Sequence, residues 1–315
     1  MKDSLPVIDI SPLRSSSLDE RSSVADDLGK ACREVGFFYA AGHGISDATM
    51  HGVFEASRQF FDLDIAAKRG MAMSRVGNNR GYVEFEHERL DPNAPPDRKE
   101  TFNIGLELQP DDPETTRPFR GINAWPDLPG FRQIMLDYYQ TCHRLGCLIH
   151  RGFSLDLGLP ELFFEDKLDA PIASLRLLRY PAAVDLASAS PGAGEHTDYG
   201  NLTILAVDGV AGLQVQRRDG VWLDAPHIPG SFVCNIGDCL MRWSNDVYVS
   251  TPHRVTIPRQ ERYSIAFFLD PNPDAPVVPV GLKAGEIAKY LPTTGAAFLR
   301  SRLEPTYSHI SQPAM

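Results

Sequence analysis

Between residues 172 and 270 the chain consists of short β-rich runs separated by turn signals, and this pattern restricts the possible folds more than any other feature. The runs are SLRLLRY, NLTILAV, GLQVQ, VWLDA, SFVCNIG and YSIAFFL. Asp219-Gly220, between GLQVQ and VWLDA, is a strong hairpin signal. Many short strands at this spacing favour an antiparallel sandwich or jelly roll. We therefore predict a mainly β fold with helical additions and a jelly-roll core.

The region from residue 1 to about 170 has a mixed pattern in which helices are prominent. Ser17-Leu-Asp-Glu20 has the form of a capping box, which marks the start of a helix. Apolar residues then recur at helical spacing until Gly36. The same kinds of pattern predict a buried strand over 37–40, a helix from about residue 47, a long polar loop over 74–98 and the longest helix over about 131–158.

No linker separates the helical and β-rich regions, so we expect one integrated structural unit. Within it we distinguish a mixed α/β region with the long helix (1–170), the β core (171–275) and a C-terminal helical segment (276–315). The last segment has a helix-like pattern from Ala284 to about Arg302, with a break at Pro292.

Composition excludes several classes of partner. The net charge of −10 over 315 residues gives no basic surface for nucleic acid or for anionic membranes. No apolar run reaches the length of a membrane span, and the N-terminus lacks the features of a secretory signal. Five cysteines without a CxxC pair indicate a reducing compartment, so a cytoplasmic location is expected. The oligomeric state is not determined by the sequence.

Glu195-His196-Thr197-Asp198 is a candidate for part of a metal site. On a strand, His196 and Asp198 project to the same face because side chains alternate. His253, at the head of another predicted strand, can supply a third ligand. Two histidines and one carboxylate leave coordination positions open, as Fe(II) oxygen chemistry requires. Two alternatives remain at this point: a catalytic zinc ion in a hydrolase, and a surface turn in which Asp198 caps a backbone amide.

Arg262 and Ser264 share one face of the predicted strand RYSIAFFL. An arginine that points inward on an apolar strand is costly unless it meets an anion, and a carboxylate suits the guanidinium fork. The hydroxyl of Ser264 can donate to the same carboxylate. The alternative is that Arg262 points outward and pairs with Glu261 or another surface acid.

A set of ordered motifs resembles the isopenicillin-N-synthase-like group of Fe(II)/2-oxoglutarate dioxygenases over nearly the whole chain. The motifs are LPVIDIS near the start, VGFFYAAGHGI at 35–45, RGY at 80–82, HTDYGNLTIL at 196–205, GLQV at 212–215, NIGD at 235–238, STPHRV at 250–255 and RYSIAFF at 262–268. The resemblance implies a double-stranded β-helix with iron held by His196, Asp198 and His253. Two positions depart from the family pattern: Leu178 replaces a usual asparagine, and Asn201 replaces a usual leucine.

The same resemblance implies that Arg262 and Ser264 bind the distal carboxylate of 2-oxoglutarate, and that Tyr180 also touches this cosubstrate. It implies oxidation of a small organic molecule, by hydroxylation or desaturation, with O2 consumed and succinate and CO2 released. The substrate pocket is expected near the 74–90 loop, the strand around 102–104 and the C-terminal helix. Its candidate side chains are those of Arg80, Tyr82, Phe102 and Ile104.

Three rival functions stay open at the level of sequence. One is an iron oxidase (cyclase) of the same fold that uses no 2-oxoglutarate, and another is an ethylene-forming type that fragments 2-oxoglutarate itself. The third, from another class, is a non-catalytic jelly-roll binding protein. Formation of succinate separates the first from a dioxygenase, ethylene in the headspace reveals the second, and metal-dependent O2 uptake tests the third.

Overall fold

The computed structural model describes residues 4–76, 78–89, 95–183, 191–282 and 285–303. The helices are α1 (Leu18–Glu34), α2 (Asp47–Phe61), α3 (Ile65–Gly70), α4 (Met73–Val76), α5 (Phe131–Asp156), α6 (Asp238–Trp243) and α7 (Gly295–Leu303), with short 3-10 helices η1 (Ser11–Arg14), η2 (Pro113–Thr116) and η3 (Glu165–Lys167). The strands are β1 (Val7–Asp9), β2 (Phe37–Ala41), β3 (Gly81–Val83), β4 (Glu100–Gly105), β5 (Ala173–Tyr180), β6 (Ala193–His196), β7 (Leu202–Val207), β8 (Leu213–Gln216), β9 (Trp222–Asp224), β10 (Ser231–Ile236), β11 (His253–Val255), β12 (Arg262–Leu269), β13 (Pro276–Val277) and β14 (Thr293–Thr294).

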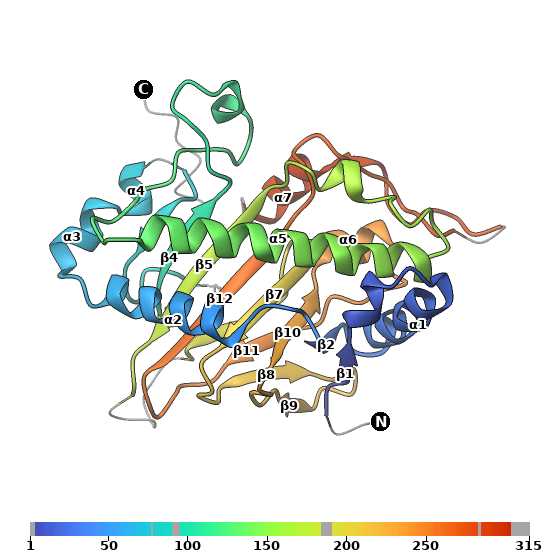
Figure 1. The fold of residues 1–315 in the computed structure, drawn as a ribbon, viewed down its shortest axis with the longest axis horizontal. Helices are drawn as coiled ribbons and strands as arrows, with labels where there is room; N and C mark the ends of the chain where they lie inside the picture. Colours follow the sequence, from blue (N-terminus) through green and yellow to red (C-terminus); the bar gives the residue numbers. More distant parts are fainter. Residues whose placement is uncertain (1–3, 77, 90–94, 184–190, 283–284, 304–315) are drawn as a thin grey trace.

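Two facing sheets form the centre of the molecule (Figure 1). The large sheet has the strand order β1-β2-β10-β7-β12-β5-β4-β3, and the small sheet has the order β6-β11-β8-β9. From β5 to β12 the chain passes repeatedly from one sheet to the other. Apolar side chains of both sheets pack in one cluster, which includes Leu178 and Ala266 of the large sheet and Val215 and Val255 of the small one. This is the predicted jelly-roll core, and that prediction is confirmed.

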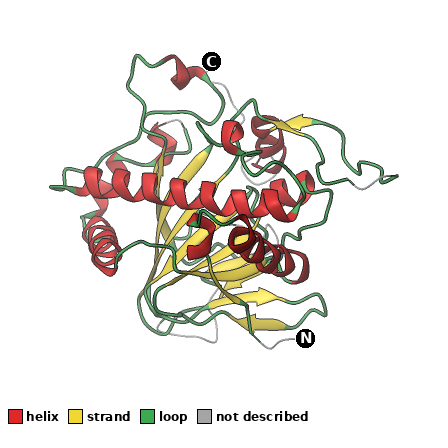
Figure 2. Cartoon of the chain, turned by 45° about the vertical axis from the view of Figure 1, so that its right-hand side comes forward, coloured by secondary structure: helices red, strands yellow, loops and turns green. Residues whose placement is uncertain are grey.

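Helices cover the other face of the large sheet. The long helix α5 crosses the strands, as Figures 1 and 2 show, and α1 and α2 pack beside it. The side chains of β12 alternate between the two faces of the large sheet, and both faces are covered. Four of them belong to the apolar cluster under the helices: Tyr263, Ile265, Phe267 and Leu269. The intervening residues, from Arg262 to Phe268 in steps of two, point to the space between the sheets. Strand β12 is therefore buried on both faces, and its inner face carries the polar residues.

The N-terminal region joins the same sheet. Ser17 accepts a hydrogen bond from the backbone N–H of Glu20, which confirms the predicted helix start. Gly36 ends the helix segment at φ +73°, and a Cβ there would lie 2.2 Å from the carbonyl oxygen of Val249, so only glycine fits. Strand β2 follows and pairs with β10, while β3 and β4 extend the opposite edge through β5. The division of the chain at residues 170 and 275 stays a prediction.

Two predicted segments differ from the structure. The polar stretch 74–98 is predicted as a loop, but α4 ends within it and β3 pairs with β4 there. The C-terminal helix begins only at Gly295, and residues 285–292 are not helical; Ala284 lies outside the described residues. Pro292 contributes to the second difference, because it has no N–H to donate and disfavours helical conformation in the residue before it. Thr293 and Thr294 then form β14, which pairs with β13.

Two further findings bear on the surroundings of the protein. None of the helices in the described segments is long and apolar enough to cross a membrane. All five cysteines are free thiols, and four of them are buried.

His150 makes stability depend on pH. Its imidazole is buried on α5, where Nδ1 bonds the carbonyl of Gly146, and burial lowers its pKa to about 4. The unfolded chain binds the proton near pH 6.5, so stability is full above that pH and is lost as the pH falls towards 4. Between pH 7 and 4.5 the parent should lose about 2–3 kcal/mol more unfolding free energy than His150→Gln. Urea unfolding at the two pH values measures this, and equal losses in both proteins would contradict it.

Candidate active site

Strands β6 and β11 bring two histidines together. His196 is the last residue of β6 and His253 is the first residue of β11, and the two are partners in the antiparallel register. Asp198 lies two residues beyond the end of β6, so the following loop and not the strand itself presents the carboxylate. One ligand atom from each of the three side chains lies within 4.8 Å of the other two. The predicted set therefore converges on one point.

The separations fit a shared metal ion. Asp198 Oδ1 lies 3.8 Å from His196 Nε2 and 3.6 Å from His253 Nε2. Two ligand atoms that are each about 2.1 Å from one ion can be up to about 4.2 Å apart. Two histidines and one carboxylate with open positions are the ligand set of non-haem Fe(II) oxygenases.

Backbone carbonyls orient both imidazoles. His196 Nδ1 lies 2.7 Å from the carbonyl oxygen of Gly194, and His253 Nδ1 lies 3.2 Å from that of Thr251. Each Nδ1–H therefore donates to the backbone, which leaves the Nε2 lone pair for a metal. Burial, together with the neighbouring His253, lowers the pKa of His196. The imidazole is thus neutral, as a metal ligand must be.

Two side chains of the large sheet hold the other carboxylate oxygen of Asp198. Oδ2 accepts hydrogen bonds from Thr203 Oγ1 at 2.5 Å and from Asn235 Nδ2 at 2.7 Å. Thr203 on β7 and Asn235 on β10 are register partners, so both reach the same oxygen. Burial alone would raise the pKa of Asp198, but the two imidazoles and these hydrogen bonds lower it. The carboxylate is therefore ionised, and Oδ1 faces the histidines.

The N-terminal strand β2 forms part of the wall of the site. The ring of Phe37 packs edge-on against the imidazole of His253, with the ring centroids 5.2 Å apart. Phe37 is also the register partner of Asn235. The first 41 residues of the chain therefore reach the metal ligands directly.

Removal of the hydrogen bonds to Asp198 should weaken metal binding. Asn235→Ala and Thr203→Val are each expected to lower Fe(II) affinity by about 10- to 100-fold, because the carboxylate loses a group that orients it. Anaerobic titration with Fe(II), and with Mn(II) as a redox-silent check, measures the change. Thr101→Val is a matched control, because the buried Thr101 hydroxyl has no hydrogen-bond partner among the described residues. Unchanged affinity in both variants would show that Asp198 needs no such support.

Arg262 begins β12 and is buried on the inner face of the large sheet. Its Nε donates to the carbonyl oxygen of Val210 at 3.3 Å, and Nη1 donates to Ser264 Oγ at 3.3 Å. The guanidinium also lies 4.8 Å from the centre of the Tyr180 ring, and Tyr180 is its register partner on β5. The structure thus brings together the three side chains predicted to hold 2-oxoglutarate.

The guanidinium of Arg262 has no anionic partner in the part of the chain that the structure describes. Glu261, the alternative partner considered from the sequence, pairs with Arg179 instead. A buried cation without an anion is costly, so this position is suited to a carboxylate supplied from outside the chain.

The predicted substrate pocket needs a correction at three of its four residues, Tyr82, Phe102 and Ile104. Tyr82, Phe102 and Ile104 belong to the cluster under the helices, and the ring of Phe102 lies 4.2 Å from that of Phe60 on α2. They point away from the space between the sheets, because the inner positions of β4 are those of alternate residues such as Asn103. Arg80, the fourth residue of the predicted set, is buried beside Gly105 at the end of β4.

The inner face of β4 and β5 carries polar residues that the sequence patterns did not single out. Asn103 and Arg176 are register partners, and Arg176 Nε donates to Asn103 Oδ1 at 2.7 Å. The guanidinium of Arg176 lies 5.5 Å from the centre of the Phe268 ring, and Phe268 pairs with Thr203. These side chains therefore lie on the same side of the sheet as the triad. Strand alternation is the sequence signal that could have found these residues, because it makes Asn103 and Phe102 project to opposite faces of the sheet.

A jelly roll with two histidines, one carboxylate and a buried unpaired arginine has the features of a non-haem iron oxygenase with an anionic cosubstrate. Comparison with known proteins identifies the family. Residues 5–128 match the model described as non-haem dioxygenase in morphine synthesis N-terminal, and residues 171–271 match the 2OG-Fe(II) oxygenase superfamily. The chain belongs to the 2OG-Fe(II) oxygenase superfamily, and it is a 2-oxoglutarate- and Fe(II)-dependent oxygenase.

Two relatives and one solved structure match along 90% or more of their own lengths. A homoarginine-6-hydroxylase of Oryza sativa subsp. japonica is 38% identical over 91% of this chain and 92% of its own. A 2-oxoglutarate-Fe(II) type oxidoreductase of Emericella nidulans is 33% identical over 96% and 90%. A full-length Neurospora crassa protein, crystallised in complex with alpha-KG (2-oxoglutarate), superposes with a TM-score of 0.88 at 31% identity, covering 98% of this chain and 100% of that one.

Proposed function

We propose that this oxygenase hydroxylates a small polar organic molecule, with Fe(II) held by His196, Asp198 and His253. Arg262, Ser264 and Tyr180 are the proposed cosubstrate site. The observation that supports this assignment best is the buried guanidinium of Arg262, on the face of the sheet that also carries Thr203, the hydrogen-bond donor to Asp198. A dicarboxylate cosubstrate supplies the anion that the described residues do not.

Each side chain has a separate task in this proposal. The two imidazoles and Asp198 Oδ1 face the metal, while backbone carbonyls and Asn235 hold them in place. Arg262 orients the distal carboxylate, and the Tyr180 ring lies against the guanidinium. When bound, Fe(II), 2-oxoglutarate and O2 supply the oxidising power and yield succinate and CO2. The apolar side chains between the sheets exclude water from the reacting groups.

The names of the relatives favour hydroxylation over desaturation or ring closure. Homoarginine-6-hydroxylases of Oryza sativa, Glycine max and Arabidopsis thaliana are 36–39% identical to this chain. The Neurospora crassa protein has also been crystallised with thymine. These molecules are small and polar, and we propose a substrate of that kind. A cytoplasmic location is proposed as well, because the five thiols are free.

A substrate panel assayed for 2-oxoglutarate-dependent succinate, with mass spectrometry of the products, tests the proposal. The expected result is a product heavier by one oxygen atom, formed together with succinate, only when Fe(II) and O2 are present. Zn(II) should inhibit, because it has no redox chemistry. Turnover by an iron-free, zinc-loaded preparation would establish a hydrolase instead, and product without succinate would establish an oxidase.

A further inference from the structure

Arg80 is a second fully buried arginine without an anionic partner. Its exposed fraction is 1%, the same as that of Arg262. Nη1 donates to the side-chain and backbone oxygens of Asn79, at 2.5 and 3.4 Å, and Nη2 donates to the carbonyl oxygen of Phe119 at 3.2 Å. Nε is buried with no hydrogen-bond partner, and no carboxylate of the described segments lies within ion-pair distance. Burial lowers the pKa of the guanidinium to about 10, so it remains charged at neutral pH.

The guanidinium lies on the inner face of the large sheet. A Cβ built on Gly105 would lie 1.9 Å from the guanidinium carbon of Arg80, so the arginine occupies the place of a side chain at that position. Gly105 alternates with Asn103 on β4 and therefore faces the space between the sheets. Its register partner is Ser174, which pairs with Phe268, and Phe268 pairs with Thr203. Arg80 thus lies in the same row across the sheet as the hydrogen-bond donors to Asp198.

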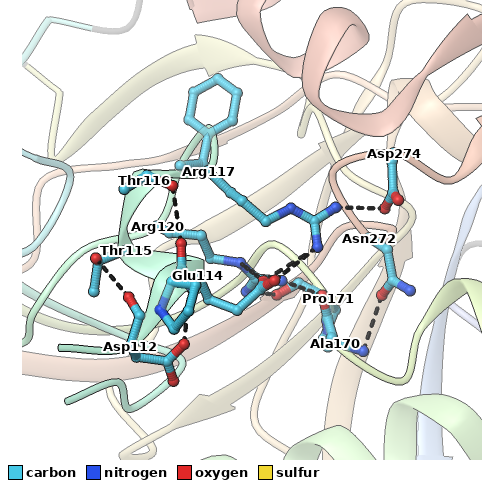
Figure 3. Close-up of polar contacts among 12 residues, drawn as sticks. Asp112, Glu114, Thr115, Thr116, Arg117, Arg120, Ala170, Pro171, Asn272 and Asp274 are labelled. Carbon is cyan, nitrogen blue, oxygen red and sulfur yellow. Dashed lines mark hydrogen bonds and ion pairs between the residues drawn. The ribbon is translucent and has the colours of Figure 1, made fainter.

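The segment around Phe119 also connects Arg80 with the triad. Phe119 packs in a small apolar cluster with Tyr199, which directly follows Asp198. Figure 3 shows how the segment is anchored: Arg120 donates to the carbonyls of Ala170 and Pro171, just before β5, and Arg117 pairs with Asp274. The carbonyl that orients Arg80 is therefore fixed in place.

The three buried arginines of the described chain differ in how their charge is balanced. Arg120 has a carboxylate, Glu114, at 3.6 Å, in addition to its two carbonyl acceptors. Arg80 and Arg262 have only neutral acceptors. Neutral acceptors do not offset the cost of burying a cation, whereas a carboxylate can engage two of its N–H groups at once. Arg262 is accounted for by 2-oxoglutarate, which leaves Arg80 as the buried arginine of the described residues without an anion.

We propose that Arg80 binds a carboxylate of the primary substrate, so that the substrate class is a small organic acid or amino acid. The inference rests on the proposed function, because it assigns the substrate of that same site. The substrate then lies between two charges of known position, with its acid group at Arg80 and its reacting carbon at the metal. A buried Nε–H and Nη–H pair on one edge of the guanidinium suits a planar, two-oxygen acceptor.

The test uses the full-length enzyme with Fe(II) and a panel of small carboxylic acids and amino acids, including L-homoarginine, each paired with its primary amide. Thymine is a neutral comparison. Two readouts are followed: succinate formation, and the anaerobic change that each compound causes in the visible band of the Fe(II)–2-oxoglutarate chelate. The acids should respond and their amides should not. Arg80→Gln should raise the KM for the acid at least about tenfold, since a charge-assisted hydrogen bond contributes about 1.5–3 kcal/mol.

Two controls keep the result specific to Arg80. Arg75→Gln removes an exposed arginine of the nearby helix α4 and should change neither readout. The melting temperature of substrate-free Arg80→Gln should equal or exceed that of the parent, because the variant removes an uncompensated buried charge. A large loss of melting temperature with unchanged KM would make Arg80 a structural residue.

The proposal is overturned if the acids give no response, if the amides or thymine respond as well as the acids, or if Arg80→Gln keeps the parent KM. In each of these cases an intact chelate band shows that the proposed iron and 2-oxoglutarate sites still stand. If the parent forms no such band, the proposed function fails first.

Discussion

Replacement of His196, Asp198 or His253 by alanine is expected to abolish turnover while the protein remains folded. Each change removes one of only three protein ligands, and their ligand atoms converge within 4.8 Å. Loss of the metal removes several kcal/mol of catalytic stabilisation, which corresponds to a loss on the order of a thousandfold or more. Iron content by metal analysis and succinate formation measure the two effects separately.

A matched control is available on the surface. His51 on α2 is exposed, so His51→Ala removes an imidazole without touching the site and should keep full activity and iron content. Melting temperatures of all four variants should stay near that of the metal-free parent. Full activity in any one of the three ligand variants would refute the triad as the iron site.

Replacement of Arg262 should weaken 2-oxoglutarate binding and leave iron binding nearly unchanged. Arg262→Lys keeps the charge but loses the two-pronged fork, so it is not a conservative change. The loss of one charge-assisted hydrogen bond, about 1.5–3 kcal/mol, corresponds to roughly ten- to a hundredfold in affinity. Arg262→Ala should be weaker still, because it leaves the carboxylate in a buried site without a partner. Ser264→Ala should show a smaller shift in the same direction.

The measurement is an anaerobic titration of 2-oxoglutarate, followed by the visible band of the Fe(II) chelate. Arg259 lies nearby and is exposed, so Arg259→Lys is the control for a change of arginine to lysine in this segment. If Arg262→Lys binds 2-oxoglutarate as tightly as the parent, the cosubstrate site lies elsewhere. If it weakens only the primary substrate, an oxidase that uses no 2-oxoglutarate becomes the better assignment.

The core of the fold could be predicted because turn residues and β-rich runs recur over one continuous stretch of the chain. The Asp219-Gly220 turn connects β8 and β9 as expected, and Gly220 has φ +84°. Strand β3 is not predicted, for a physical reason: it has only three residues, and its pairing with β4 is not a local property of the polar sequence around it. The late start of α7 is not predicted because Thr293 and Thr294 form β14 and pair with β13, which is not a local property of the sequence.

The candidate site is partly predictable for similar reasons. The two-residue spacing of His196 and Asp198 suggests a shared direction, and both side chains do converge, although Asp198 lies beyond the strand. The sequence of β4 does not show which of its side chains point into the space between the sheets. Polar and apolar residues alternate along it, but all six are buried, so no exposed face marks which set points between the sheets. The sequence alone therefore places Phe102 on the wrong side. The partners of Asp198 come from β7 and β10, whose register only the folded sheet defines.

The contact of Phe37 with His253 has a consequence for how the protein is made. Strand β2 hydrogen-bonds to β10, and Phe37 pairs with Asn235, which is synthesised 198 residues later. At a synthesis rate of about 5–20 residues per second, the wait on the ribosome is roughly 10–40 s. During that time β2 can pair only with β1, and the edge that later joins β10 stays open beside Phe37, Phe38 and Tyr39, which are buried in the finished protein. Nascent chains that stop before β10 is complete therefore carry an aromatic strand with one open edge, and molecular chaperones that shield such edges should raise the yield of active enzyme.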